Sequence, residues 1–385
     1  MSSVDQNLIE QLEKYKGYLD VDPDNAGIIC QVADLYVRLQ DLASAKTVLA
    51  DALSRSPLNN QLLFNMSNIA IAQSDFDYAI DVLETMISQG VEAPAIRYNL
   101  AYALAFKADY SGARDQLLLI SDAGELPQTY LLLGKMYHFL GDMEKAIESI
   151  NSYLAIKPGD TEAMGVLSLM YIDDEDMERA FALAKDALAV DPMQQEALLS
   201  AGTVSIAHND IAEARDLFEK AITVKQSSGR AWAGKGLTSM LALDLEGAIS
   251  DLKKAVEYMP EHIGTWHTLA WCYLVSKDYE TAKACFERTL KIDDRFGETY
   301  GGLAVISILQ QDFEHTEELI KKSIRLNPAS FSGHFARSLY QQHRGNTEEA
   351  VKIVEKIFLS LNSLEGTDFS GLLKKVISKN VSKIQ

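Results

Sequence analysis

Small and apolar residues recur along the chain at a fixed spacing of about 34 residues. Within each interval the apolar positions follow steps of three and four, which predicts helices packed through one face. One small residue marks the register of every unit, 34 positions after the previous one except for a single step of 33. These marker residues are Ala45, Ala79, Ala113, Ala146, Ala180, Ala214, Ala248, Ala282, Thr316 and Ala350. A fixed period of this length predicts a solenoid of repeated helical hairpins instead of a globule.

A second place in the unit is small throughout. When the marker residue is numbered as the twentieth place of its unit, the eighth place holds Ala, Ser or Gly in all ten units. The residues at the eighth place are Ala33, Ser67, Ala101, Gly134, Ser168, Gly202, Gly236, Ala270, Ala304 and Ser338. Small side chains at both places let the two helices of a hairpin approach closely.

Larger residues complete the pattern. Aromatic residues recur at the fourth place, as Tyr130, Trp232, Trp266 and Tyr300. Tyrosine recurs at the eleventh place, as Tyr36, Tyr137, Tyr171 and Tyr273. The twenty-fourth place is apolar in every unit. Proline closes several units, where it ends one helix before the next begins, as Pro57, Pro158, Pro192, Pro260 and Pro328.

The segments MGVLSLMYIDDEDMERAFALAKDALAVDP and WHTLAWCYLVSKDYETAKACFERTLKIDD carry this order of places intact. The chain therefore resembles the tetratricopeptide repeat family, with ten repeats over residues 26 to about 364. The resemblance implies an all-α fold, a right-handed superhelical α-solenoid of helical hairpins. It also implies a non-catalytic protein–protein interaction role, although the same scaffold serves many unrelated functions.

The two ends predict capping helices. Residues 1–25 include a stretch, 6–22, that resembles the second helix of an incomplete repeat and would shield the first hairpin. Residues 365–385 carry an apolar stripe at helical spacing, formed by Phe369, Leu372, Leu373, Val376 and Ile377. This stripe predicts a C-terminal capping helix, with a partner-binding or membrane-surface helix as the alternative.

Three departures from the pattern predict local irregularity. Repeat 3 is one residue short within 121–126, which predicts a tighter exit loop. Thr316 replaces alanine at the close-contact place and is expected to separate the helices of repeat 9 slightly. Lys235 and Arg337 occupy the normally apolar seventh place, so their stems are expected to cover apolar surface while their charges reach water.

The formal net charge is −19 and the isoelectric point is near 4.8. This charge argues against nucleic-acid and anionic-membrane binding, both of which need concentrated Lys and Arg. It fits a basic partner, or an acidic surface that only keeps the helices soluble.

Cys30, Cys272 and Cys285 do not have the spacing of a disulfide framework. We expect them to be reduced thiols that pack in the core. The sequence shows no secretory leader and no apolar run long enough to span a membrane, so a cytoplasmic protein is expected.

In the family that the chain resembles, the second, fifth, sixth, ninth, twelfth and thirteenth places line the concave groove. Repeats 2 and 3 place there the residues Phe64, Asn65, Asn68, Tyr98, Asn99, Tyr102 and Phe106. Asn65 and Asn99 share the sixth place of adjacent units and predict a short ladder of amides. Such amides both donate to and accept from the backbone of an extended peptide, whereas ordinary surface or inter-repeat packing is the alternative.

A second candidate patch lies in repeats 8 to 10. Its predicted groove residues are His267, Trp271, Phe335, Leu339 and His343. Gly301 and Gly302 are expected to floor the groove there and leave room for a ligand side chain. An exposed tryptophan beside small residues is a typical binding hot spot, although a capping helix would cover it equally well.

The middle of the groove is predicted to be apolar, because leucine recurs at its fifth or ninth places. These leucines are Leu131, Leu169, Leu199 and Leu237. An apolar concave strip favours an amphipathic helix or an extended hydrophobic segment as the ligand. It also favours self-association into a homo-oligomer, because exposed apolar patches are rarely left uncovered.

No pattern of catalytic, cofactor-binding or metal-binding residues appears. The acidic run 173–176 lacks the glycine and spacing of a calcium loop, and Gly234-Lys235-Gly236 lacks the rest of a phosphate loop. The basic clamp that some co-chaperones of this family use for acidic chaperone tails is also missing. We therefore expect an adaptor without enzymatic activity, cofactor or metal.

Two alternatives to the adaptor remain. One is an architectural subunit or self-assembling scaffold of a larger complex, such as secretion, envelope or surface-polymer machinery. The other is an accessory subunit that delivers substrate to a partner enzyme. The repeat pattern alone does not distinguish these roles.

Overall fold

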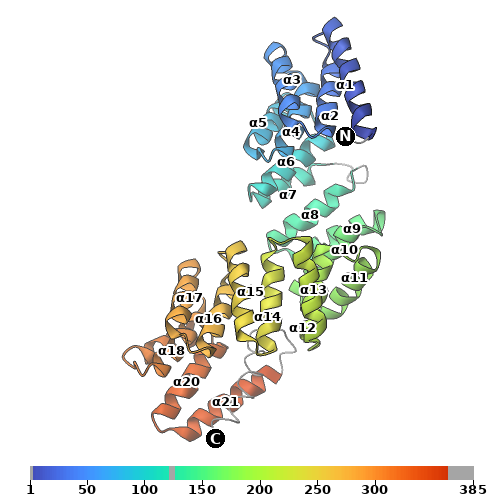
Figure 1. Cartoon of the computed structure of the whole chain (residues 1–385). Coiled ribbons are helices and arrows are strands. Elements are labelled where there is room, and N and C mark those ends of the chain that lie inside the picture. Colours follow the sequence, from blue (N-terminus) through green and yellow to red (C-terminus); the bar gives the residue numbers. More distant parts are fainter. Residues whose placement is uncertain (1–2, 121–125, 363–385) are drawn as a thin grey trace. The chain divides into compact units, whose positions relative to one another are not determined.

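The computed structural model describes residues 3–120 and 126–362, which form helices joined by short turns (Figure 1). The chain divides into two compact units, Met1–Pro158 and Gly159–Gln385, which we call unit 1 and unit 2. No strand occurs among the described residues. The all-α solenoid of hairpins predicted from the sequence is confirmed.

The helices follow the predicted register, two to a repeat. Unit 1 contains α1 (Ser3–Val21), α2 (Ala26–Arg38), α3 (Leu42–Arg55), α4 (Asn60–Ala72), α5 (Phe76–Ser88), α6 (Pro94–Phe106), α7 (Tyr110–Leu118), α8 (Gln128–Phe139) and α9 (Met143–Ile156). Unit 2 contains α10 (Thr161–Asp173), α11 (Met177–Val190), α12 (Gln195–Ala207), α13 (Ile211–Val224), α14 (Gly229–Leu241), α15 (Leu245–Tyr258), α16 (Ile263–Val275), α17 (Tyr279–Ile292), α18 (Gly297–Leu309), α19 (Thr316–Leu326), α20 (Phe331–His343) and α21 (Thr347–Asn362).

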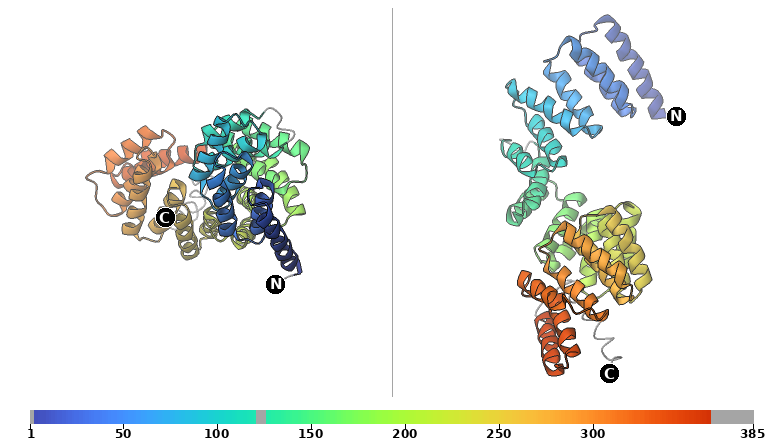
Figure 2. Two further views of the ribbon diagram at one scale, coloured as in Figure 1. Left: turned by 90° about the horizontal axis from the view of Figure 1, so that it is seen from above. Right: turned by 90° about the vertical axis from the view of Figure 1, so that its left-hand side faces the viewer.

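The helix α1 covers the free side of the first hairpin (Figure 2). Its side chains Leu8 and Leu12 are buried against Val32 and Leu35 of α2. This contact replaces the neighbour that every inner repeat has. The C-terminal helix predicted around Phe369 lies outside the described residues, as does most of the short segment 121–126.

The marker residues lie where the two helices of each hairpin meet. Nine of the ten are fully buried, at 0% exposure, and Ala350 is 6% exposed. The eighth place faces the same contact: a Cβ added to Gly134 would lie 2.6 Å from the side chain of Ile150. Serine is tolerated there because its hydroxyl donates to the carbonyl three residues earlier, as Ser168 does to Gly165 at 2.7 Å. The small places therefore act as predicted.

Three aromatic residues of the fourth place bond their helices α14, α16 and α18 to the preceding loop. Trp232 Nε1 donates to the Gln226 carbonyl and Trp266 Nε1 to the Pro260 carbonyl, both at 2.8 Å. Tyr300 repeats this bond with a carbonyl six residues earlier, at 2.9 Å. The ring therefore packs against the repeat while its polar atom satisfies a loop carbonyl.

The turn inside each hairpin uses one backbone device in all ten repeats. The second residue after the first helix has a left-handed φ between about +60° and +84°. These residues are Gln40, Ser74, Ala108, Gly141, Glu175, Asn209, Leu243, Lys277, Gln311 and Gly345. The next residue donates its N–H back to the first helix, as Asp244 does to Ser239 at 2.9 Å. In eight repeats it is an aspartate whose carboxylate also caps the second helix.

Leu243 is an unfavourable left-handed residue, because its Cβ crowds the following carbonyl and its apolar side chain cannot make the local hydrogen bonds that asparagine makes. Its φ is +65°. We expect Leu243→Asn to raise the free energy of unfolding of unit 2 by about 0.5–1 kcal/mol. Thermal unfolding followed by tryptophan fluorescence measures this change, because Trp232, Trp266 and Trp271 all lie in unit 2.

Gly345→Ala is the reciprocal control. No atom would contact the added Cβ, so the expected loss of unfolding free energy reports backbone strain alone. Equal midpoints for both variants would contradict the prediction.

Candidate functional site

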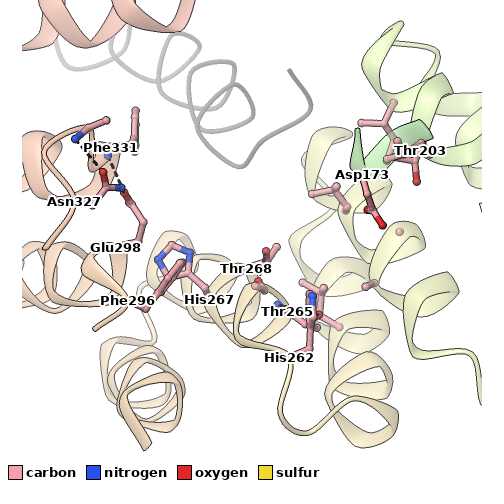
Figure 3. A pocket seen from close by; sticks show the side chains of 18 of the residues that line it. Asp173, Thr203, His262, Thr265, His267, Thr268, Phe296, Glu298, Asn327 and Phe331 are labelled. Atoms are coloured by element: carbon pink, nitrogen blue, oxygen red, sulfur yellow. Dashed lines mark hydrogen bonds between the residues drawn. The ribbon is translucent and has the colours of Figure 1, made fainter. Parts of the chain in front are cut away.

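A groove with a volume of about 1200 Å³ runs through unit 2 (Figure 3). The first helices α10, α12, α14 and α16 line it, together with the start of α18 and parts of α20 and α21. Pockets for small ligands usually have volumes of about 300–1,000 Å³. The groove is therefore large enough for a segment of polypeptide.

One wall of the groove is apolar. Leu169 of α10, Leu199 of α12 and Leu237 of α14 line it. These three leucines belong to the set that the repeat register assigned to an apolar groove. The fourth member of that set, Leu131, lies on α8 in unit 1 and is not part of this groove. Ile206 extends the same wall along α12.

The groove is polar near α18 and α20, where hydrogen bonds link the two helices. The carboxylate of Glu298 on α18 accepts hydrogen bonds from the backbone N–H groups of Phe331 and Ser332, at 3.0 and 2.9 Å (Figure 3). These N–H groups begin α20 and have no partner within that helix. Asn327 Nδ2 adds a third donor at 3.4 Å. Glu298 thus holds α20 against α18, and its carboxylate is already hydrogen-bonded to groups of the protein.

His267 lines the groove, but its ring is almost fully buried. The ring packs edge-on against Phe286 and Phe296, with ring centroids 5.4 and 5.5 Å away. This burial lowers the pKa of His267 to about 4. Trp271 Nε1 donates to His267 Nε2 at 3.4 Å, which also requires an unprotonated acceptor nitrogen. His267 is therefore a neutral packing residue at physiological pH.

The expected exposure of Trp271 is corrected by the structure. Its side chain is only 2% exposed and packs against Phe286 and Phe335, with ring centroids 6.3 Å from each. Phe335 and Leu339 are half-buried beside the same cluster, and His343 stacks on Phe313 at 4.1 Å. The patch predicted in repeats 8 to 10 is thus largely a packing core, and only His267 of this patch lines the groove.

Gly301 and Gly302 do not leave room for a ligand. A Cβ on Gly301 would overlap the backbone of Ser332 and Gly333 in α20, and a Cβ on Gly302 would overlap the Phe286 ring. Both glycines permit close helix packing, and the space beside them is filled by the protein. The expectation that they floor an open groove is wrong.

The amides predicted to form a ladder in repeats 2 and 3 bond to other groups in unit 1. Asn65 Nδ2 donates to the Gln61 carbonyl at 2.9 Å and contacts Cys30 Sγ at 3.2 Å. Asn99 Nδ2 donates to Asn68 Oδ1 at 2.7 Å. Asn65 and Asn68 also line a small cavity of about 120 Å³ between α2 and α4. A peptide bound through Asn65 and Asn99 would have to replace these hydrogen bonds with its own.

The aromatic residues of the same patch differ in exposure. Phe64, Tyr98 and Tyr102 are half-buried against the cores of repeats 2 to 4. Phe106 is 59% exposed and stacks on Phe76 at 4.7 Å. Phe106 therefore offers the accessible aromatic surface of this patch.

Sequence reasoning missed the basic residues of the unit 2 groove. Arg230 lies in the first turn of α14, whereas Lys352 and Lys356 come from α21, the second helix of the last repeat. The register assigns second helices to the outer side of the array, so it gave no signal for α21. Arg230 occupies the second place, which the register assigns to the groove. The sequence could therefore have indicated Arg230 as a groove residue.

Other candidate chemistry is limited within the part of the chain that the structure describes. No group of three or more His, Cys, Asp or Glu side chains is arranged to hold a metal ion there. The cysteines are buried and free, and burial raises the pKa of Cys272 to about 12. Among the described residues, none of the helices is long and apolar enough to cross a membrane.

Family models agree with the hairpin register. Three models described as tetratricopeptide repeat match residues 32–90 and 167–231, residues 127–160, and residues 240–304. The chain belongs to the tetratricopeptide-repeat family. Members of this repeat family generally act as protein–protein interaction scaffolds, and this repeat protein is built as one.

Individual relatives are distant. The BBSome complex member BBS4 of Mus musculus is 31% identical over 77 residues, which are 20% of this chain and 15% of that protein. The matched segment therefore spans only a small part of the curated relative. Among solved structures, a monomeric mutant of IFIT1 with Gppp-AAAA has a TM-score of 0.56 at 15% identity, covering 86% of this chain and 90% of that chain. The human IFIT1 dimer with m7Gppp-AAAA has a TM-score of 0.52 at 14% identity, covering 91% and 95%. These structures share the fold.

Proposed function

We propose that this repeat protein is a non-catalytic adaptor that holds a peptide segment of a partner protein in the groove of unit 2. The observation that supports the proposal is the groove itself, a cavity of about 1200 Å³ with an apolar wall. Leu169 and Leu237 on that wall are only half-buried, so their free surface is available to a ligand. Burial of apolar side chains from the ligand stabilises such a complex.

Polar groups along the groove suit a polypeptide ligand. Thr203 of α12 and Thr268 of α16 line it; each hydroxyl donates to a carbonyl of its own helix, at 2.9 and 2.8 Å, and keeps lone pairs that can accept from a peptide N–H. A peptide bound along the leucine wall exposes its backbone amides toward such groups. Apolar pockets with a few polar groups are the usual arrangement for recognition of a defined ligand.

The test uses a random-peptide library displayed on phage and selected against the full chain. Enriched peptides are then labelled with a fluorophore and titrated by anisotropy. We expect the double variant Leu169→Gln and Leu237→Gln to weaken binding by about tenfold or more, because two apolar contacts are replaced by polar ones. The matched control, Val190→Gln and Val224→Gln, changes exposed residues of α11 and α13 outside the groove and should bind normally.

Two outcomes would reject the groove as the site. Unchanged affinity of the leucine variant, with the fold intact by tryptophan fluorescence, is the first. The second is loss of binding in Asn65→Ala with Asn99→Ala, which would move the site to the patch in unit 1. That patch, with Phe106 as its exposed ring, remains the alternative peptide site.

An architectural role is the second candidate function. It is favoured by the mouse relative, which is named as a member of a complex, although the match covers only 15% of that protein. Exposed large apolar side chains such as Leu58, Leu119 and Phe139 would supply contact surface. Light scattering of the isolated chain discriminates the two roles: a monomer favours the adaptor, and a stable homo-oligomer favours the scaffold.

A further inference from the structure

The charges around the groove of unit 2 differ from those of the chain as a whole. The chain has 36 basic and 55 acidic residues. Among the described residues that line the groove, basic side chains outnumber carboxylates by four to three. The basic residues are Arg230, Arg337, Lys352 and Lys356, and the acidic residues are Asp173, Glu298 and Glu349.

The carboxylates of the groove are already engaged within the protein. Glu298 accepts hydrogen bonds from two backbone N–H groups of α20 and from Asn327. Glu349 lies 3.6 Å from Arg337. Asp173 also interacts with another group of the chain. The negative charges of Glu298 and Glu349 are therefore partly neutralised before any ligand binds.

Within residues 3–120 and 126–362, three of the basic groups have no such acidic partner. No carboxylate among the described residues lies within 4.0 Å of the charged groups of Arg230, Lys352 or Lys356. The positive charge of Arg230 acts on a neighbouring groove residue. The pKa of His262 is lowered mainly by burial and in addition by the Arg230 guanidinium. His262 lines the groove as well. The groove therefore presents positive charge at α14, which also carries Leu237 of the apolar wall, and at α21.

From this charge complementarity we infer that the ligand of the groove is an acidic peptide segment with interspersed apolar residues. Its carboxylates pair with Arg230, Lys352 and Lys356, and its apolar side chains contact the leucine wall. This inference rests on the proposed function and names its ligand class. It differs from the basic partner that net charge alone favours, because net charge averages over the whole surface while a bound segment meets only the groove.

A nucleic acid fits these observations less well. A polyanion long enough to span several repeats would meet the surface that gives the chain its net charge of −19, and such repulsion opposes binding. It would also place phosphates, instead of apolar groups, along Leu169, Leu199 and Leu237. An acidic peptide satisfies both the basic groups and the apolar wall.

The test compares charge and binding in the peptides selected from the random library. We expect the enriched pool to be rich in Asp and Glu together with apolar residues. The triple variant Arg230→Glu, Lys352→Glu and Lys356→Glu should weaken binding of an enriched acidic peptide about tenfold to a hundredfold, from three partly exposed ion pairs. Added salt should weaken binding to the unmodified chain, because exposed pairs are screened.

A matched variant separates the groove from net charge. Lys185→Glu, Lys283→Glu and Lys291→Glu introduces the same change in charge on α11 and α17, outside the groove. This control should bind almost normally, and an equal loss in both triple variants would overturn the inference. So would an enriched pool of basic or neutral peptides, or displacement of the bound peptide by a 5′-triphosphorylated oligoadenylate.

The outcomes distinguish the inference from the proposed function. If enriched peptides are basic but still depend on Leu169 and Leu237, the adaptor stands and the acidic ligand class is wrong. If no peptide enriches on the full chain, both fail. If acidic peptides enrich and depend on the leucine wall and on the three basic residues, both are supported.

Discussion

Replacing Phe286 with alanine lowers the free energy of unfolding of unit 2 by about 3–5 kcal/mol. Phe286 stands at the apolar twenty-fourth place of repeat 8 and is 0% exposed. Its ring contacts His267 and Trp271, and it fills the space that Gly302 leaves on α18. Alanine would leave a cavity shared by two repeats, and close packing prevents the neighbouring helices from filling it completely.

Urea unfolding followed by tryptophan fluorescence measures this loss. The probe is specific, because the three tryptophans of the chain all lie in unit 2 and Trp271 contacts the Phe286 ring directly. Circular dichroism then shows whether unit 1 retains its own transition, since distant repeats contribute separately to stability. Phe181→Ala, at a half-buried ring of α11, should cost less. Equal losses for the two phenylalanines would show that repeat 8 holds no tightly packed core.

Gly301→Ala destabilises unit 2 by about 2 kcal/mol. The added Cβ would overlap backbone atoms of Ser332 and Gly333, which cannot rotate away as a side chain does. Overpacking costs about 1–3 kcal/mol and occasionally more, whereas alanine gains only about 1 kcal/mol over glycine in a helix. The steric cost therefore decides the sign.

The same substitution in α1 should have the opposite effect. A Cβ on Gly17 would meet no atom within 4 Å, so Gly17→Ala should stabilise by up to about 1 kcal/mol through helix propensity alone. Thermal unfolding of both variants, by tryptophan fluorescence for unit 2 and circular dichroism for unit 1, checks the pair. A stabilising Gly301→Ala would mean that α18 and α20 are not in backbone contact.

The hairpin register could be predicted from the sequence because its causes are local. Ala248 and Gly236 both lie at the contact between α14 and α15: Ala248 is 0% exposed, and a Cβ on Gly236 would overlap Leu252. A larger residue at either place would separate two helices that are only a few residues apart in the chain. Small residues recur at the eighth and twentieth places of all ten repeats, so the pattern can be recognised from the sequence alone. The burial of nine marker residues at 0% exposure confirms it.

The predicted binding residues depended on contacts between repeats, which the register does not encode. The ninth place points Trp271 toward the concave side, but the close approach of α18 and α20 through Gly301 brings Phe335 over it. In the same way, Lys352 lines the groove because α21, a second helix, borders it beside α20. Such placements follow from rotations between successive hairpins, and these depend on many side chains at once.

The left-handed turn described for each hairpin has a consequence for how this chain can change over generations. Every turn is completed by groups of its own hairpin, so a duplicated or deleted stretch of 34 residues carries its own turn and leaves the others intact. Recombination can therefore lengthen or shorten the array in whole repeats without inventing a new loop. The groove can vary in length far more readily than the hairpin can vary in shape.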